Sequence, residues 1–527
     1  MSSTFGPSVD PNLLPLRHSR APASSLRIAI DLSLLRPRGE NGGIKPFAFE
    51  YIRELARIEG EAVTFVFLTW SCSHDEVRAL ARPHDELVCV RHTDDSPLSE
   101  VSGWREGEVL WLNPPPTLLV QLKVSLLYAP LGSAEFACPG VPLVVTVADV
   151  LHRDYPLTLE PHVVAHRESV FQDLVKVADR YQCISSHTAS RLIELFGVDP
   201  ARAFRTYIVI QERLDCTKAS GDRPIPEQYF FFPANAWQHK NHKTLLVAYR
   251  LYRHLAGPGA WELVLTGHDD DAMRGVLAAA QSLGIAEHVR FFGHLSDTEF
   301  AAVWRHAGAM VFPSLHEGFG IPLLESMHFG IPVLSSPDTS LSEIGSDAVL
   351  FSDPRAPDEW ARSMVKIAAD QDLRRRLVAA GKTRLGDFSL STETTAFQQV
   401  LREVASRRSD RLWSKGIHID GWTEHHAVVA LPAQGGVTQL TVNIAPMPAD
   451  RRLRLSRGLT PFGGFALAAG VPHQLCVEME LTGEPLLLEI PDAANLNPAD
   501  HRAHGVLIGS ITIGTTAGEL VVYPRRS

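Results

Sequence analysis

Two glutamates around a glycine-rich turn have the types and spacing to bind a polar ligand. The segment reads Val311-Phe-Pro-Ser-Leu-His-Glu-Gly-Phe-Gly-Ile-Pro-Leu-Leu-Glu325, so Glu325 follows Glu317 by eight positions. An apolar run that ends near Ser314 predicts a buried strand, and the turn follows it directly. The turn therefore lies at the carboxyl end of a strand, where ligands bind in parallel α/β sheets.

The residues after the turn predict the start of a helix. Pro322 is well placed as its first residue, and Gly330 is a plausible C-terminal cap. Backbone amides and the positive end of a helix attract anions, so the turn predicts a diphosphate site. Glu325, expected in the first helical turn, and Glu317, in the loop, would accept hydrogen bonds from hydroxyl groups of that ligand.

An ordinary β–α turn is the alternative interpretation. The glycines would then only allow the chain to turn tightly, and a glutamate would only stabilise the start of the helix. A lone Gly-x-Gly would favour this interpretation, because short motifs often arise by chance. Two acids, the Gly-Phe-Gly-Ile-Pro core and a preceding strand coincide here, and together they favour a ligand site.

Two stretches of the chain repeat the order strand, loop and helix. In the first, the loop Gly39–Gly43 follows a strand, and apolar residues then recur at helical spacing up to Ile58. This order predicts two doubly wound α/β domains, each with a parallel sheet covered on both faces. The predicted strands are Leu26–Asp31, Val63–Thr69, Val124–Tyr128, Leu143–Val147 and Tyr181–Ser185, then Tyr229–Pro233, Glu262–Thr266, Val289–Gly293, Met310–Ser314 and Ile331–Ser335.

Composition changes mark four parts of the chain. Residues 1–25 are rich in Ser and Pro and predict a disordered lead-in, and a polar stretch from Lys218 to Gln228 suits a linker between two domains at 26–217 and 218–408. Helical segments from Asp358 to about Arg408 would close the second domain, the last one long enough to cross back to the first. Alternating runs in 413–527 predict an antiparallel β-sandwich. These runs are Ala427–Leu431, Gln439–Asn443, Gln474–Glu480, Pro485–Ile490 and Gly518–Tyr523.

The Glu317–Glu325 segment resembles the signature of the family 4 retaining glycosyltransferases, which have the GT-B fold of two Rossmann-like domains facing a cleft. The resemblance covers roughly Leu26 to Arg408. It is carried further by Pro233-Ala-Asn-Ala-Trp-Gln-His-Lys-Asn-His242, Leu265-Thr-Gly267, Phe291-Phe-Gly-His-Leu295, Ile30-Asp31, Gly42-Gly-Ile44 and Val145-Thr-Val-Ala-Asp149.

The resemblance implies roles at the matching positions. Glu325 would bind the ribose hydroxyls of a nucleotide-sugar donor, Glu317 a hydroxyl of its hexose, and Lys240 its diphosphate. On composition alone, Lys240 is a solvated lysine at the start of a helix. The catalytic candidates are thus Glu317, Lys240 and Asp149; the remaining donor-binding candidates are Gly318, Phe319, Gly320, Ile321, Asn235, Gly43 and Gly267.

The chain departs from the family pattern at two positions. Asn235 stands where the family places an arginine, so neutralisation of the diphosphate would depend more on Lys240 and the helix end. Ala148 stands where a histidine often precedes the aspartate at 149. His152 is a candidate replacement, although an ordinary loop histidine is the alternative.

Composition excludes some classes of function. The net charge of −10 argues against general nucleic-acid binding, and the six scattered cysteines indicate buried residues of a reducing compartment. No apolar run reaches the roughly 18 residues that a membrane span requires. A cytoplasmic protein is expected, with peripheral attachment to the inner membrane left open. Six histidines could suggest a metal site, but they lack a ligand spacing, so no metal is expected. No cofactor is expected either. These histidines are His239, His242, His425, His426, His501 and His504.

The function that the resemblance implies is retaining transfer of a hexosyl group from a nucleoside diphosphate sugar, GDP-mannose-like or UDP-hexose. The expected acceptor is a glycan or lipid-linked glycan of a bacterial surface polysaccharide. A nucleotide-sugar epimerase of the same fold is one alternative. An inactive transferase-like protein that binds glycans is another, favoured by Asn235 and Ala148. The β-sandwich resembles accessory modules of some bacterial glycosyltransferases in Asp420-Gly-Trp422 and Asn497-Pro-Ala-Asp-His-Arg502.

Overall fold

The computed structural model describes residues 26–37, 43–91, 105, 108–111, 114–209, 225–407, 409, 411–433, 435–495, 504–515 and 518–524. The predicted lead-in, most of the predicted linker, Gly42, Cys216 and the segment 497–502 lie outside these residues. The chain divides into two compact units. The first comprises residues 1–146, 170–181 and 397–527, and the second comprises residues 147–169 and 182–396.

The first α/β sheet has eight strands in the order β4-β3-β2-β1-β5-β6-β7-β8, and each neighbouring pair from β4 to β6 is parallel. Its central strands are buried apolar runs, as the sequence predicts. The bounds are β1 Leu26–Leu32, β2 Val63–Trp70, β3 Glu86–Arg91, β4 Val109–Leu110, β5 Leu126–Ala129, β6 Leu143–Val147, β7 Arg180–Cys183 and β8 Ala203–Arg205. The helices in this part of the chain are α1 Ile44–Glu59, α2 His74–Arg78, α3 Leu118–Gln121, α4 Leu151–Asp154, α5 Pro161–Val177 and α6 Ser186–Phe196.

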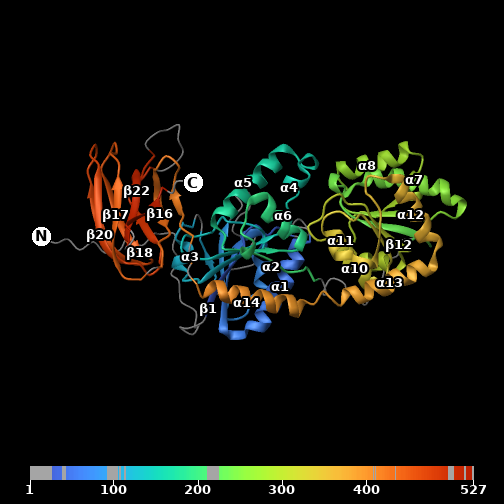
Figure 1. The fold of residues 1–527 in the computed structure, drawn as a ribbon, viewed down its shortest axis with the longest axis horizontal. Coiled ribbons are helices and arrows are strands. Elements are labelled where there is room, and N and C mark those ends of the chain that lie inside the picture. Colours follow the sequence, from blue (N-terminus) through green and yellow to red (C-terminus); the bar gives the residue numbers. More distant parts are fainter. Residues whose placement is uncertain are drawn as a thin grey trace. The chain divides into compact units, whose positions relative to one another are not determined.

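The second α/β sheet is parallel throughout, with six strands in the order β11-β10-β9-β12-β13-β14. Helices lie on both of its faces (Figure 1). The strands are β9 Tyr229–Pro233, β10 Glu262–Thr266, β11 Val289–Phe291, β12 Ala309–Phe312, β13 Val333–Ser335 and β14 Val349–Phe351. The helices are α7 His242–Ala256, α8 Asp271–Ser282, α9 Asp297–His306, α10 Ile321–Phe329, α11 Ser340–Gly345, α12 Pro357–Ala369, α13 Gln371–Leu385 and α14 Leu390–Ala405.

Helix α14 is the long last helix that the sequence predicts. From Phe397 onward it belongs to the first unit. Phe397 is fully buried there, with its ring centroid 4.9 Å from that of Tyr128 and 6.1 Å from that of Tyr51. Burying an aromatic side chain stabilises packing by several kcal/mol, so this contact anchors the end of the helix.

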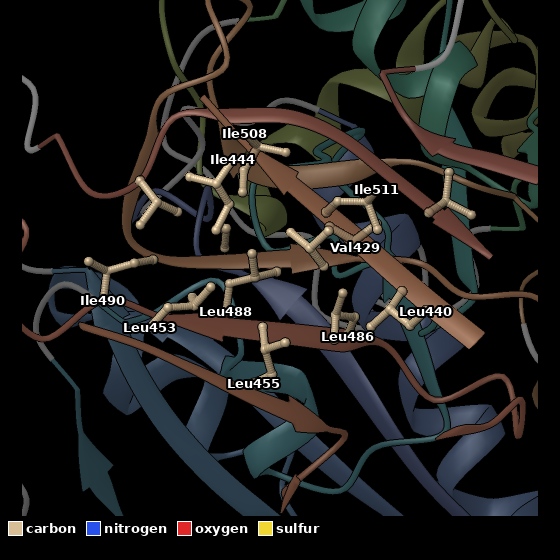
Figure 2. Close-up of a cluster of buried hydrophobic side chains, with 14 of the residues drawn as sticks. Val429, Leu440, Ile444, Leu453, Leu455, Leu486, Leu488, Ile490, Ile508 and Ile511 are labelled. Carbon is tan, nitrogen blue, oxygen red and sulfur yellow. The ribbon is translucent and has the colours of Figure 1, made fainter. Parts of the chain in front are cut away.

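The predicted β-sandwich is confirmed as two antiparallel sheets, in the orders β15-β16-β21-β18-β19 and β20-β17-β22-β23. Leu455 and Leu488 from one sheet and Leu440 and Ile511 from the other belong to one buried apolar cluster (Figure 2). This region therefore has a core of its own. The strands are β15 Ser414–Ile417, β16 Thr423–Val429, β17 Val437–Ile444, β18 Arg451–Arg457, β19 Thr460–Leu467, β20 His473–Glu480, β21 Leu486–Glu489, β22 Ile508–Thr515 and β23 Gly518–Tyr523.

Two whole-chain expectations can be compared with the described residues. Among them, no helix is both long and apolar enough to cross a bilayer. Cys89, Cys138 and Cys183 are buried, whereas Cys476 is exposed, so the prediction of buried cysteines is wrong for Cys476. Burial raises the pKa of the Cys138 thiol to about 12, which keeps it protonated and unreactive.

Candidate functional site

Strand β12 positions the loop that carries Glu317. Its four residues are all buried, and it pairs with β9 on one side and β13 on the other. The loop at 313–320 leaves the carboxyl end of this strand, and α10 begins at Ile321 with Pro322 as its second residue. The predicted order of strand, glycine-rich loop and helix is therefore present, with Pro322 one place later than expected.

Two glycines in the loop are required for different reasons. A Cβ atom at Gly318 would lie 1.9 Å from the carbonyl oxygen of Ala148 and 3.2 Å from Cβ of Asp149, so only glycine fits beside that segment. Gly320 has a φ of +97°, a backbone conformation that residues other than glycine rarely adopt. The loop backbone thus passes directly against residues 148 and 149.

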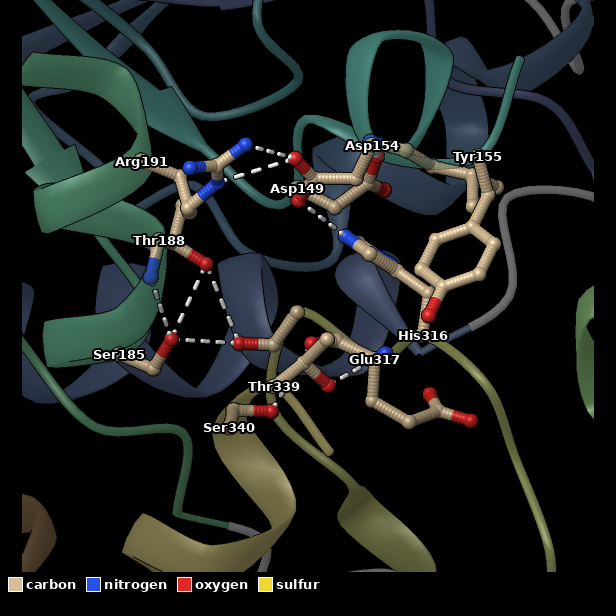
Figure 3. A network of polar contacts seen from close by, with 12 residues as sticks. Asp149, Asp154, Tyr155, Ser185, Thr188, Arg191, His316, Glu317, Thr339 and Ser340 are labelled. Carbon is tan, nitrogen blue, oxygen red and sulfur yellow. Dashed lines mark hydrogen bonds and ion pairs between the residues drawn. The ribbon is translucent and has the colours of Figure 1, made fainter. Parts of the chain in front are cut away.

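Hydroxyl groups hold the loop backbone on both sides. Thr339 Oγ1 accepts a hydrogen bond from the Glu317 amide at 3.0 Å, and Ser340 Oγ donates to the carbonyl of Glu317 at 2.9 Å. Ser185 Oγ donates to the carbonyl of Gly318 at 2.7 Å, and Thr188 Oγ1 donates to it at 3.2 Å (Figure 3). These contacts leave the Glu317 side chain as the part of the residue that can meet a ligand.

Lys240 and Glu317, both predicted as catalytic, form an ion pair. Lys240 ends a short 3-10 helix at Gln238–Lys240 after β9, and its Nζ lies 2.6 Å from Glu317 Oε1. The side chains are only 13% and 11% exposed, so Lys240 is not the solvated lysine that composition alone suggests. The Leu315 amide also donates to the carbonyl of His239 at 2.8 Å and joins the two loops. An ammonium and a carboxylate thus share one sheltered position at the ends of β9 and β12.

Asn235 and Gly267 lie against each other where β9 and β10 end. Asn235 Oδ1 accepts a hydrogen bond from the His268 amide at 3.0 Å, and a Cβ atom at Gly267 would lie 3.1 Å from the same oxygen. This oxygen of Asn235 therefore fixes the neighbouring loop. The donor-binding roles of both residues remain predictions.

Glu325 is 3% exposed and lies within α10. The helix begins at Ile321, so Glu325 starts its second turn and not the first turn that we expect from the sequence. The amides at the start of a helix lack intrahelical partners, and Pro322 has no N–H, which leaves Ile321 as the first donor of α10. Phe319 is buried, with its ring 5.9 Å from that of Tyr207. Its side chain therefore anchors the loop, and its proposed contact with a donor would involve only its backbone.

Asp149 follows β6 and accepts a hydrogen bond from the Leu151 amide at 2.9 Å, and it forms an ion pair with Arg167. Burial would raise the pKa of Asp149, but Arg167, the Leu151 amide and His316 together lower it below its usual value. Asp149 is therefore a carboxylate at neutral pH, next to Gly318. His152 lies in the short helix α4 and is buried, and its role as a replacement for the missing histidine stays a prediction.

A polar network that the sequence did not predict surrounds His316, the residue before Glu317 in the loop (Figure 3). His316 Nε2 lies 3.1 Å from Asp154 Oδ2, and Arg191 Nε donates to Asp154 Oδ1 at 2.9 Å. Burial would raise the pKa of Asp154, but the hydrogen bonds from His316 and Arg191 lower it to about 2. The three residues belong to segments far apart in sequence, so no local pattern signals the network.

Gly43 precedes α1 in the first unit, and its carbonyl accepts a hydrogen bond from the Phe47 amide at 3.4 Å. Its φ of −67° is one that any residue adopts, so this conformation does not require glycine. Its predicted role beside the donor phosphates stays a prediction.

Comparison with known proteins finds a family model that matches one region of the chain. Residues 217–384 match the model described as glycosyl transferases group 1. This region contains a glycosyl transferase group 1 domain. The domain includes β9 to β14 and every candidate residue from Asn235 to Glu325.

Individual proteins that are similar to this chain are also glycosyltransferases. The chain is 26% identical over 246 residues to O-antigen chain mannosyltransferase B of Escherichia coli, across 44% of this chain and 62% of that protein. It is 28% identical over 222 residues to the serotype-specific mannosyltransferase WbdA of Escherichia coli, across 40% of this chain and 27% of that protein. The matches thus span less than two thirds of either relative.

The fold is similar to that of solved structures with two Rossmann-like domains. Sucrose-phosphate synthase from Thermosynechococcus elongatus superposes with a TM-score of 0.54 at 17% identity, across 72% of this chain and 99% of that chain. The glycosyl transferase group 1 domain and the preceding α/β domain therefore have the GT-B fold, as predicted, and the β-sandwich is an addition to it.

Proposed function

We propose that the protein is a retaining glycosyltransferase that transfers a hexosyl group from a nucleoside diphosphate sugar to a glycan or lipid-linked glycan. The observation that carries the proposal is the Lys240–Glu317 pair, sheltered at the strand ends of the glycosyl transferase group 1 domain. A lysine ammonium and a carboxylate suit the two halves of such a donor. The phosphates attract the cation, and the sugar hydroxyls donate to the anion.

Donor binding would divide this ion pair between two parts of one ligand. The diphosphate would compete with Glu317 for the Lys240 ammonium, and a hexose hydroxyl would then donate to the released Glu317 oxygen. The start of α10 adds backbone amides and a positive helix end for the phosphates. Glu325, one helical turn beyond, would accept hydrogen bonds from the ribose.

The reaction breaks the bond between the anomeric carbon and the phosphate oxygen and forms a bond from that carbon to the acceptor oxygen. The electron pair of the broken bond stays with the diphosphate, whose charge Lys240 stabilises. The acceptor oxygen attacks the anomeric carbon on the same face from which the leaving group departs. The acceptor proton passes to the departing phosphate oxygen. The anomeric configuration is therefore retained. Mannose is the sugar named for both Escherichia coli relatives, which favours a GDP-mannose-like donor over a UDP-hexose.

A turnover assay tests this proposal. The full chain is incubated with GDP-mannose, UDP-glucose and UDP-galactose, each with and without an oligomannoside acceptor, and products are followed by NMR. We expect nucleoside diphosphate release that depends on acceptor, and an α-linked product from an α-linked donor. A β-linked product would refute retention. Conversion of the donor sugar without acceptor would identify an epimerase, and no turnover under any condition would favour the inactive glycan-binding alternative.

A further inference from the structure

We propose that Asp154, His187 and His316 form a binding site for Zn²⁺. One ligand atom of each residue lies within 4.8 Å of the other two. Two imidazoles and one carboxylate are a donor set that zinc binds readily, and magnesium and calcium prefer oxygen ligands alone. The site goes beyond the proposed transfer reaction, and the sequence predicted no metal.

The separation of the first two ligands already suits a bound ion. His316 Nε2 lies 3.1 Å from Asp154 Oδ2. Zinc bonds of about 2.0–2.1 Å in tetrahedral geometry place neighbouring ligand atoms about 3.3 Å apart. Zinc would replace their hydrogen bond, with the imidazole proton on Nδ1 and Nε2 facing the ion. The third ligand would approach by at most about 1.5 Å to close the 4.8 Å separation, a shift that side-chain rotation supplies.

His187 supplies an independent observation. Its Nε2 is shielded from solvent and has no hydrogen-bond partner among the described residues. A buried polar atom without a partner destabilises a fold by about 1–3 kcal/mol, and a metal bond would remove that penalty. The backbone at His187 is held in place, because the Ser186 and His187 amides donate to the Glu343 carboxylate at 2.8 and 3.0 Å.

Arg191 orients the carboxylate ligand. Its Nε donates to Asp154 Oδ1 at 2.9 Å, which leaves Oδ2 directed at His316. Carboxylate ligands of metals commonly have such a second partner. Arg191 also forms an ion pair with Glu194, which offsets its positive charge near a cation.

The consequence concerns Glu317. The three ligands come from the end of α4, the start of α6 and the loop residue that precedes Glu317. An ion between them would fix this loop at a third point, beyond the contacts of Thr339 and Gly318. Three protein ligands leave a fourth position for water.

Zinc titration of the full, untagged chain tests the site. After dialysis against a chelator, ZnCl₂ is titrated in competition with a chromophoric chelator. We expect one equivalent of tight binding in the wild type, and an affinity at least 10-fold lower in Asp154→Asn and His187→Gln. Arg191→Gln should weaken binding about 10- to 100-fold, the usual effect of removing a partner of a metal ligand. His268→Gln is the matched control, because His268 and His294 stack on each other in an exposed position with ring centroids 5.8 Å apart.

Cobalt spectroscopy makes the test independent of how the variants fold. Co²⁺ bound to the wild type should give visible bands of nitrogen and oxygen coordination without a thiolate charge-transfer band. The proposal is overturned if the wild type binds less than about 0.1 equivalent of Zn²⁺, if a thiolate band appears, or if the folded His187→Gln variant binds as tightly as His268→Gln.

Discussion

Replacing Gly318 by alanine tests how the Glu317 loop is held. The new Cβ would lie 1.9 Å from the Ala148 carbonyl oxygen, and contacts under 3.0 Å are essentially never seen, so the two backbones must separate by about 1.1 Å. Overpacking of this kind costs about 1–3 kcal/mol. The shift also lengthens the hydrogen bond from Ser185 to the Gly318 carbonyl, worth about 0.5–1.5 kcal/mol. We expect the free energy of unfolding to fall by about 2–4 kcal/mol.

Gly275→Ala is the matched control for this substitution. Gly275 lies exposed within α8, and its Cβ would meet nothing within 4 Å. Alanine in a helix interior is about 0.5–1 kcal/mol more stable than glycine, so this variant should be slightly more stable than the wild type.

Urea unfolding followed by circular dichroism measures both variants. Calorimetry with a nucleoside diphosphate should show weaker binding for Gly318→Ala, because the loop moves away from Asp149. A Gly318→Ala variant within about 0.5 kcal/mol of the wild type would refute the close contact between this loop and residues 148 and 149.

Three further predictions follow from particular residues. Glu325→Gln should weaken binding of a nucleoside at least about 10-fold in calorimetry, since an acceptor for ribose hydroxyls is lost, while Glu287→Gln on the exposed surface should leave it unchanged; equal affinities would refute the ribose role. Burial lowers the pKa of His242 to about 4, below its unfolded value of about 6.5, so its contribution to stability is full above pH 6.5 and is lost as pH falls toward 4. His242→Gln should therefore make the free energy of unfolding less dependent on pH between 6.5 and 5, by up to about 1.4 kcal/mol per pH unit, and an unchanged slope in urea titrations would contradict this. Leu455→Ala in the sandwich core should lower the free energy of unfolding by about 2–5 kcal/mol, measured in urea, and leave the nucleotide dissociation constant unchanged. Weaker nucleotide binding would mean that the sandwich helps to build the donor site.

The α/β domains were predictable because buried parallel strands are continuous apolar runs. Tyr229–Pro233 and Glu262–Thr266 have the predicted bounds. Strand β14 was missed, although with three residues it is as long as β11 and β13, which lie within predicted runs. Strand β18 was also missed, although its exposed arginines alternate with buried leucines in the period of a strand.

The candidate site was predictable where its residues are close in sequence and not where they meet only in the fold. Glu317, Gly318 and Gly320 share one loop and one motif, so the sequence could group them. The hydrogen bond between His316 and Asp154 joins residues 162 positions apart, and no local pattern encodes it. The ion pair between Lys240 and Glu317 was not predicted either, because the resemblance assigned each residue to a ligand rather than to the other.

Calorimetry of Lys240→Ala tests the central claim most directly. If Lys240 contacts the donor diphosphate, its removal should weaken nucleoside diphosphate binding about 10- to 150-fold, which corresponds to about 1.5–3 kcal/mol for a charge-assisted hydrogen bond. Binding of the free nucleoside should be unchanged. Lys243→Ala, an exposed lysine in the first turn of α7, should bind both ligands as the wild type does. Equal losses for diphosphate and nucleoside, or no loss for either, would contradict the proposed donor site.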